Sequence, residues 1–275
     1  MSRLTPTRVV GIASGKGGVG KTTIAINVAA SLVKKGQKVL LLDGDMGLAN
    51  IQLGLGVRCE YNISHVFSGE KQLEDIIETT GSGVDLVPGA SGLKDLASLN
   101  TTEIGTLIQS FSTIEQHYDC LLVDGAAGVS DSVIGILGAC QYRFIVLQDE
   151  PTSIADAYAA IKVLVNEGNT SGIYLLPNLV SGAAHADKIS ADLKKIILRF
   201  LDIEVRGAGY ISEDEAIRLS WRQGKPVAES FPNSVCAREF DRIASLITDL
   251  PIQDVHDSGG MAFFLDKLHS FQESA

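Results

Sequence analysis

The sequence has few cysteines and no cysteine pairs, and this excludes several classes of protein. Its 275 residues include 4 cysteines and 5 histidines. The cysteines (Cys59, Cys120, Cys140 and Cys236) form no Cys-x-x-Cys pair, which indicates buried thiols in a reducing compartment. The histidines also lack the spacing of metal ligands. A disulfide scaffold, a structural metal site and an iron–sulfur centre are therefore not expected.

Positive charge is also scarce. The chain has 23 Lys and Arg against 33 Asp and Glu, which gives a formal net charge of -10. Non-specific binding to nucleic acid comes mostly from neutralising phosphates, so we expect no strong nucleic-acid binding. A local basic patch would still be compatible with this composition.

Long apolar runs are missing too. No signal peptide precedes the first apolar segment and no run is long enough to span a membrane, so we expect a cytoplasmic protein. With 45% hydrophobic residues the chain can bury a full core. We expect one α/β domain over residues 1–250, a polar linker over 251–260 and a terminal segment over 261–275.

The most informative stretch is Gly-Lys-Gly-Gly-Val-Gly-Lys-Thr at residues 15–22. It fits the P-loop pattern, in which backbone N–H groups surround a phosphate, a lysine supplies positive charge and a hydroxyl binds Mg²⁺. In this sequence Lys21 supplies the positive charge, and Thr22 supplies the hydroxyl. An apolar strand at 8–13 and a helix at 22–33 are expected on either side. The predicted nucleotide contacts are Gly15, Lys16, Gly17, Gly18, Val19, Gly20, Lys21, Thr22 and Thr23.

Acidic residues follow two further apolar runs. The run 38–42 ends at Asp43 and Asp45, and the run 120–123 ends at Asp124. Unbroken apolar runs are typical of parallel strands covered on both faces, and ligands bind at the carboxyl ends of such strands. Asp124 is therefore predicted to accept a hydrogen bond from Mg²⁺-bound water or from Thr22. Asp43 fits a role in this site or in capping a loop equally well.

The remaining pattern predicts a mostly parallel, doubly wound sheet flanked by helices. Small helices and turns are expected over 51–83. The helix at 102–117 would begin at Thr101 or Thr102, and the helix at 154–165 at Thr152 or Ser153. Further strands are predicted at 84–87, 142–147, 172–176 and 205–211, and further helices from Glu215 and from Ser234.

The second lysine of the loop, Lys16, makes residues 15–22 resemble the deviant Walker A motif of the MinD/ParA family. The resemblance implies that Lys16 reaches across a dimer to the partner's nucleotide and that Asp45 positions the attacking water near Mg²⁺. Residues 149–162 resemble the FlhG/FleN regulators of flagellar number. An acid at the position of Glu150 can contact the partner's nucleotide in such dimers, but a carboxylate that favours helix entry is an equally good interpretation.

The resemblance also implies where the base binds. In P-loop folds of this type an Asn after the sixth strand, here Asn178, hydrogen-bonds adenine, and a turn with Ile211 and Glu213 completes the pocket. The chain contains no Asn-Lys-x-Asp run, which favours ATP over GTP. Two positions depart from the family pattern: Gly44 replaces the usual alanine, and Gly125 replaces Thr, Ser or Cys.

The terminal segment differs from the rest of the chain. Apolar residues between 261 and 271 share one face of a predicted amphipathic helix. The resemblance implies membrane contact when the protein is dimeric, and a location on the inner membrane or at the cell pole. However, helices that lie on anionic lipid are usually rich in Lys and Arg, and this one is not. Docking in a groove of the same protein is the alternative.

The expected function is that of a Mg²⁺-dependent ATPase that switches between monomer and ATP-bound homodimer. By resemblance its partners are a flagellar transcriptional activator of the FleQ/FlrA type and the polar flagellar GTPase of the FlhF type. The alternatives are a MinD-type division-site ATPase, a ParA-type partitioning ATPase and a metabolic P-loop enzyme. The match at 149–162 counts against a MinD-type division protein, and the acidic chain counts against a DNA-binding ParA-type protein. A metabolic enzyme would need a second substrate site, which the sequence does not show.

Overall fold

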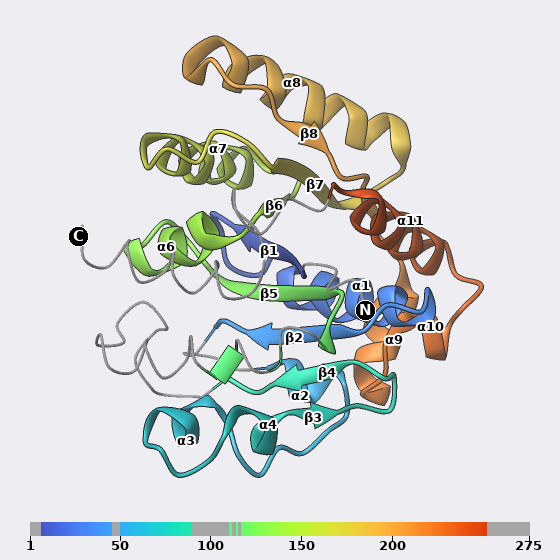
Figure 1. The fold of residues 1–275 in the computed structure, drawn as a ribbon. Coiled ribbons are helices and arrows are strands. Elements are labelled where there is room, and N and C mark those ends of the chain that lie inside the picture. Colours follow the sequence, from blue (N-terminus) through green and yellow to red (C-terminus); the bar gives the residue numbers. More distant parts are fainter. Residues whose placement is uncertain (1–6, 46–49, 90–109, 112–113, 115–116, 252–275) are drawn as a thin grey trace.

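The computed structural model describes residues 7–45, 50–89, 110–111, 114 and 117–251. Within these residues one sheet runs through the molecule in the order β3-β4-β2-β5-β1-β6-β7-β8, and β9 pairs with β7 (Figure 1). All pairings are parallel except that of the edge strand β3 with β4. The strands are β1 (Arg8–Ser14), β2 (Val39–Asp43), β3 (Glu78–Thr79), β4 (Asp85–Val87), β5 (Cys120–Ala127), β6 (Tyr142–Leu147), β7 (Ile173–Val180), β8 (Arg206–Gly207) and β9 (Ile211–Ser212).

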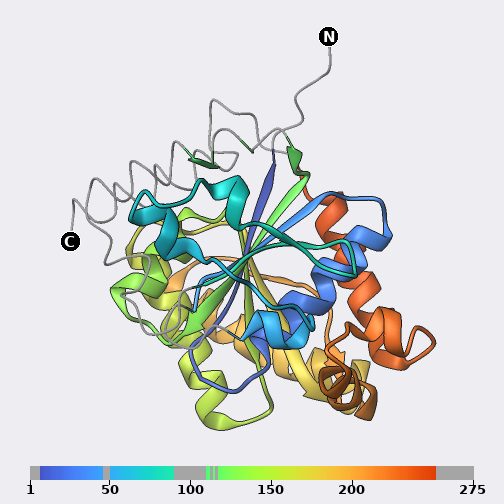
Figure 2. The same ribbon diagram turned by 90° about the horizontal axis from the view of Figure 1, so that it is seen from below.

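Helices cover both faces of the sheet, as Figure 2 shows from below. One face packs against α1 and α11, and the other against α3, α4, α6, α7 and α8. The helices are α1 (Lys21–Lys34), α2 (Ile51–Gly54), α3 (Ile63–Phe67), α4 (Leu73–Ile76), α6 (Asp131–Ala139), α7 (Pro151–Asn166), α8 (Ala183–Leu201), α9 (Glu215–Gln223), α10 (Val227–Ser230) and α11 (Val235–Asp249). The mostly parallel α/β fold predicted from the sequence is confirmed.

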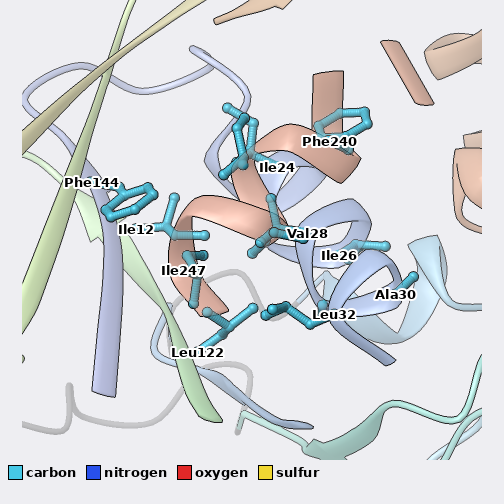
Figure 3. Close-up of a cluster of buried hydrophobic side chains, with 14 of the residues drawn as sticks. Ile12, Ile24, Ile26, Val28, Ala30, Leu32, Leu122, Phe144, Phe240 and Ile247 are labelled. Atoms are coloured by element: carbon cyan, nitrogen blue, oxygen red, sulfur yellow. The ribbon is translucent and has the colours of Figure 1, made fainter. Parts of the chain in front are cut away.

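The central strands are apolar on both sides because both sides are covered. Val10 and Ile12 of β1 face the α1 layer, whereas Val9 and Ala13 face the opposite layer. This double burial explains the unbroken apolar runs, since a strand with one solvated face would alternate. In Figure 3, side chains of the sheet and of the two helices on this face form one cluster: Ile12, Leu122, Phe144, Ile24, Val28, Leu32, Phe240 and Ile247.

Several predicted boundaries were wrong. The helix predicted over 154–165 begins at Pro151, and its N-cap is Glu150 in place of Thr152 or Ser153. Proline suits this first position because its missing N–H would have no partner there. The strand predicted over 205–211 is split into β8 and β9, and Gly209 between them has a φ of 99°. A positive φ of this size breaks the extended conformation.

Other predictions concern residues that are not described. The helix expected over 102–117 falls mostly outside the described residues, and so does the terminal segment 261–275. Among the described residues, no helix is both long and apolar enough to cross a membrane.

Candidate functional site

The glycine-rich loop lies between β1 and α1, at the carboxyl end of the central strand. Gly18 and Gly20 have φ angles of 76° and 98°, a conformation that glycine adopts without strain. Gly15 lies so close to α7 that a Cβ there would be 2.2 Å from the carbonyl oxygen of Asp156. The loop thus requires glycine both for its turns and for its packing, and it opens onto the N-terminus of α1.

Lys21 is the first residue of α1, and it is only 8% exposed. Burial lowers the pKa of its ammonium group, and the charges of Asp124 and Asp45 act in the opposite direction. A desolvated cation at a helix N-terminus is stabilised by an anion, and the exposed N–H groups of that terminus favour the same ligand. The lysine is therefore placed to bind a phosphate group.

Two carboxylates lie side by side on neighbouring strands, and one of them, Asp124, interacts with this lysine. Asp43 at the end of β2 pairs in register with Asp124 of β5, and both are 1% exposed. The Thr22 hydroxyl donates to Asp124, which helps to keep that group ionised. Among the described residues, Asp43 Oδ2 and Asp124 Oδ1 have no hydrogen-bond partner. A buried carboxylate oxygen without a partner is costly, so this pair favours a proton or a cation.

The arrangement fits Mg²⁺ bound together with phosphates. Mg²⁺ takes oxygen ligands and usually keeps several waters, so it needs only one or two carboxylates and the substrate phosphates. The side chains of Thr22, Asp45 and Asp124 supply such oxygens at this edge of the sheet. Within the described part of the chain, no three His, Cys, Asp or Glu side chains form a complete metal site. A cation here would need further oxygen ligands, such as water or phosphate.

The buried carboxylates predict a pH-dependent stability. Burial, and then repulsion by Asp124, raise the pKa of Asp43 from 3.8 to about 8, and burial raises the pKa of Asp124 to about 7. The folded protein therefore retains protons that the unfolded chain has already lost, and its free energy of unfolding falls as pH rises through this range. The expected slope is about 1.4 kcal/mol per pH unit for each retained proton.

Urea unfolding of the nucleotide-free protein between pH 5 and 9, in the presence of a metal chelator, measures this slope. Asp43→Asn should flatten it and should be more stable than the original protein at the upper end of the range. Asp192→Asn, which changes an exposed carboxylate of α8, should leave the slope unchanged. Parallel pH profiles for the Asp43→Asn and the original protein would contradict the assignment of the proton to Asp43.

Lys16 contacts the residues that begin α7 in the same subunit. Its ammonium group forms an ion pair with Glu150 and lies 3.3 Å from the Thr152 hydroxyl. Both side chains of the ion pair are well exposed, Lys16 by 37% and Glu150 by 50%. The structure thus brings Lys16, which the family resemblance directs toward a partner's nucleotide, together with Glu150, for which that contact is one of two interpretations, and it leaves both side chains exposed.

Asn178, one of the residues predicted to bind the base, also lies beside the loop. Asn178 is inside β7, not after it, and it pairs in register with Ile211 of β9. Its side-chain amide donates to the Val19 carbonyl oxygen at 2.6 Å, which fixes the loop. The backbone N–H of Glu213 donates to the Val180 carbonyl oxygen at 3.0 Å. Asn178 therefore supports the phosphate loop directly, and this loop-stabilising role does not require a bound base.

The two glycines that depart from the family pattern lie where strands approach closely. A Cβ at Gly44 would be 2.8 Å from the Asp124 carbonyl oxygen, and one at Gly125 would be 3.1 Å from the Ile12 carbonyl oxygen. The Gly44 N–H donates to that same Asp124 oxygen at 2.9 Å. Glycine at position 44 thus allows β2 and β5 to stay hydrogen-bonded up to the acidic residues.

Sequence reasoning left two contributors to this site unassigned. The sequence left Asp43 with two roles, in the site or as a loop cap. The signal that could have decided between them is that both apolar runs end in Asp-Gly, which indicates that Asp43 and Asp124 are aligned on paired strands. Trp221 of α9 donates its indole N–H to the Thr23 hydroxyl oxygen at 2.9 Å. These residues are 198 positions apart, and no local pattern links them.

A parallel sheet with a glycine-rich loop at the carboxyl end of its central strand, a buried lysine and adjacent carboxylates defines a P-loop nucleoside triphosphatase. Residues 7–170 match the family model described as an AAA domain. The chain is 36% identical to the antiactivator FleN of Pseudomonas aeruginosa over 98% of its length and 95% of that protein. It is 33% identical to the flagellum site-determining protein YlxH of Helicobacter pylori over 88% of its length and 82% of that protein.

A solved structure agrees with these relatives. The septum site-determining protein MinD of Pyrococcus horikoshii, complexed with Mg-ADP, superposes with a TM-score of 0.70 at 26% identity. The match covers 88% of this chain and 96% of that one. The chain therefore belongs to the MinD/ParA family of P-loop ATPases and is a homologue of the flagellar regulators FleN and YlxH.

Proposed function

We propose that this protein is a Mg²⁺-dependent ATPase that switches between a monomer and an ATP-bound homodimer. In this proposal the dimer regulates flagellar number and placement by antagonising a flagellar transcriptional activator. The observation that carries the catalytic part is the buried Lys21 near Asp124 and Asp45, together with the unpartnered buried oxygens of Asp124 and its neighbour Asp43. The regulatory part rests on the similarity to FleN and YlxH over most of the chain.

Each site residue has a distinct part in this proposal. Lys21 and the N–H groups of residues 15–20 bind the phosphates of ATP. Thr22 and Asp124, with Asp45, hold the Mg²⁺ ion, which neutralises phosphate charge when bound. Asp45 also orients the attacking water. The exposed Lys16 reaches the nucleotide of the partner subunit, and Asn178, Ile211 and Glu213 enclose the base.

We also propose partners and a location for the protein. The acidic chain and its lack of apolar runs support a cytoplasmic regulator that acts on proteins, not on DNA. A transcriptional activator of the FleQ/FlrA type and a GTPase of the FlhF type are the proposed partners. Residues 261–271 would give the dimer a reversible contact with the membrane.

The Asp45→Ala protein tests the switch. Without the side chain that orients water, ATP should bind but turn over slowly, so the dimer should accumulate. We expect light scattering to show a doubling of the solution mass with ATP and Mg²⁺, and no change without nucleotide or with ADP. The exposed Asp192→Ala variant is the matched control and should turn over ATP as the original protein does. An unchanged mass with ATP, or full turnover by Asp45→Ala, would refute the mechanism.

A further inference from the structure

The hydrogen bond between Trp221 and Thr23 connects α9 to the helix that follows the phosphate loop. Trp221 is the only tryptophan of the sequence, and its indole N–H lies 2.9 Å from Thr23 Oγ1. Thr23 belongs to the first turn of α1 and follows Thr22 directly. The contact therefore acts on a hydroxyl at the phosphate-binding end of α1.

The position of the indole ring is fixed by glycines. A Cβ at Gly54 of α2 would lie 3.0 Å from Trp221 Cη2, so the ring occupies the space that a side chain would need. Two residues further on, Gly56 and Gly224 bring their backbones together, and a Cβ at Gly56 would lie 2.6 Å from the Gly224 carbonyl oxygen. The close approach of α2 and α9 holds Trp221 against α1.

A second set of hydrogen bonds holds the backbone of the same threonine. The Asn27 amide donates to the Thr23 carbonyl oxygen at 2.8 Å. The Asn27 side-chain oxygen accepts in turn from the Val227 N–H, at the start of α10, at 2.7 Å. Thr23 is therefore anchored through both its main chain and its side chain by the α9–α10 segment.

In the contact with Trp221, the Thr23 hydroxyl is the acceptor and keeps its own hydrogen. A threonine hydroxyl has one hydrogen to donate and two lone pairs that accept. Within a helix it commonly donates back to a carbonyl oxygen of the preceding turn. Here Trp221 occupies a lone pair, and among the described residues the hydroxyl hydrogen has no acceptor. That hydrogen remains for a ligand at the N-terminus of α1.

We propose that Trp221 is a positioning residue for nucleotide binding: its N–H holds the Thr23 hydroxyl in the orientation that donates to a phosphate oxygen. The proposal rests on the proposed ATPase function, because it requires a phosphate at this helix terminus. Without the indole N–H, the hydroxyl is no longer held in that orientation, and the phosphate loses one charge-assisted hydrogen bond.

Four proteins test this proposal: the original chain, Trp221→Phe, Thr23→Val and the double variant. Phenylalanine keeps an aromatic ring against Gly54 but has no N–H, and valine keeps the shape of threonine without its hydroxyl. We expect the Kd for Mg-ADP, measured by calorimetry, to rise about tenfold in either single variant. In the Thr23→Val background, Trp221→Phe should cause no further loss, because the hydroxyl that it positions is already absent.

Tryptophan fluorescence gives a readout that does not depend on activity. In the nucleotide-free protein, Thr23→Val should shift the emission of Trp221 to shorter wavelength, because the indole N–H loses its acceptor. Thr23→Ser, which restores a hydroxyl, should return both the emission and the ADP affinity toward the original values. Urea unfolding checks that all five proteins are folded.

The outcomes separate this inference from the ATPase proposal. If the original protein fails to bind Mg-ADP, the proposed function fails. If it binds and Trp221→Phe has the same cost with and without the Thr23 hydroxyl, the tryptophan acts only through packing and the inference is overturned. An unchanged Kd in Trp221→Phe would overturn it equally.

Discussion

Replacing Lys21 with alanine is expected to abolish the binding of ATP and of ADP. Lys21 is 8% exposed, and burial lowers the pKa of its ammonium group, so part of its desolvation cost is recovered only when an anion is bound. Charge-assisted hydrogen bonds of this kind contribute about 1.5–3 kcal/mol each, and the lysine also offsets the charge of Asp124. We expect the Kd for Mg-ATP in calorimetry to rise at least about a hundredfold.

Lys34 provides the matched control because it lies at the opposite end of the same helix and is exposed. Lys34→Ala removes one positive charge from α1 without touching the phosphate loop, so its nucleotide affinity should be unchanged. Thermal unfolding without nucleotide verifies that Lys21→Ala is folded. If Lys21→Ala bound Mg-ATP within a few fold of the original protein, the phosphate site would be elsewhere.

The sequence predicts the central strands well because their environment leaves a simple signal. Residues 142–147 were expected to form a strand and do so with the same bounds, as β6. The motif Gly15–Thr22 could also be predicted, since a phosphate loop needs consecutive residues in a fixed order. Both features could be predicted because each is determined by consecutive residues.

The sheet edge was harder to predict because it depends on pairing between distant segments. A strand was expected to stop before Pro177, yet β7 continues to Val180. Pro177 pairs with Leu147, the last residue of β6, and the strand beyond it pairs with β9. Proline is tolerated where one neighbouring strand ends, since no ladder hydrogen bond is lost beyond that point.

The electrostatics of the site could not be predicted from the sequence, because they depend on how distant segments pack together. Asp43 and Asp124 become neighbours only through the register of β2 and β5, and their raised pKa values follow from burial at that place. The sequence places each at the end of an apolar run but does not show that one oxygen of each lacks a partner. Likewise, the ion pair of Lys16 with Glu150 joins two segments that the sequence could relate only through family resemblance.

Replacing Lys16 with alanine is expected to leave ATP binding intact and to prevent the ATP-bound dimer. Its ammonium group pairs with Glu150 of the same subunit and is partly exposed, so its removal leaves the fold and the Lys21 site in place. A cation supplied to a phosphoryl group from a partner can be worth about a thousandfold or more in rate. ATP turnover should fall by about that factor, and light scattering should show a monomer with ATP and Mg²⁺. Normal dimerisation of Lys16→Ala would exclude a role across the dimer.

Glu150→Gln then distinguishes the ion pair with Lys16 seen in the structure from a contact with the partner's nucleotide, because these two roles predict opposite changes in the dimer Kd. If Glu150 only holds Lys16 within one subunit, its neutralisation frees the lysine, and the ATP-bound dimer becomes tighter. An exposed ion pair contributes about 0.2–1 kcal/mol and a symmetric dimer has two of them, so the dimer Kd should fall by no more than about thirtyfold. If Glu150 itself contacts the partner's nucleotide, the dimer becomes weaker. Glu167→Gln, at the C-cap of the same helix α7, is the control and should leave the dimer Kd unchanged. The intrasubunit pair seen here favours the first outcome, in which Lys16 exchanges Glu150 for a phosphate of the partner's ATP.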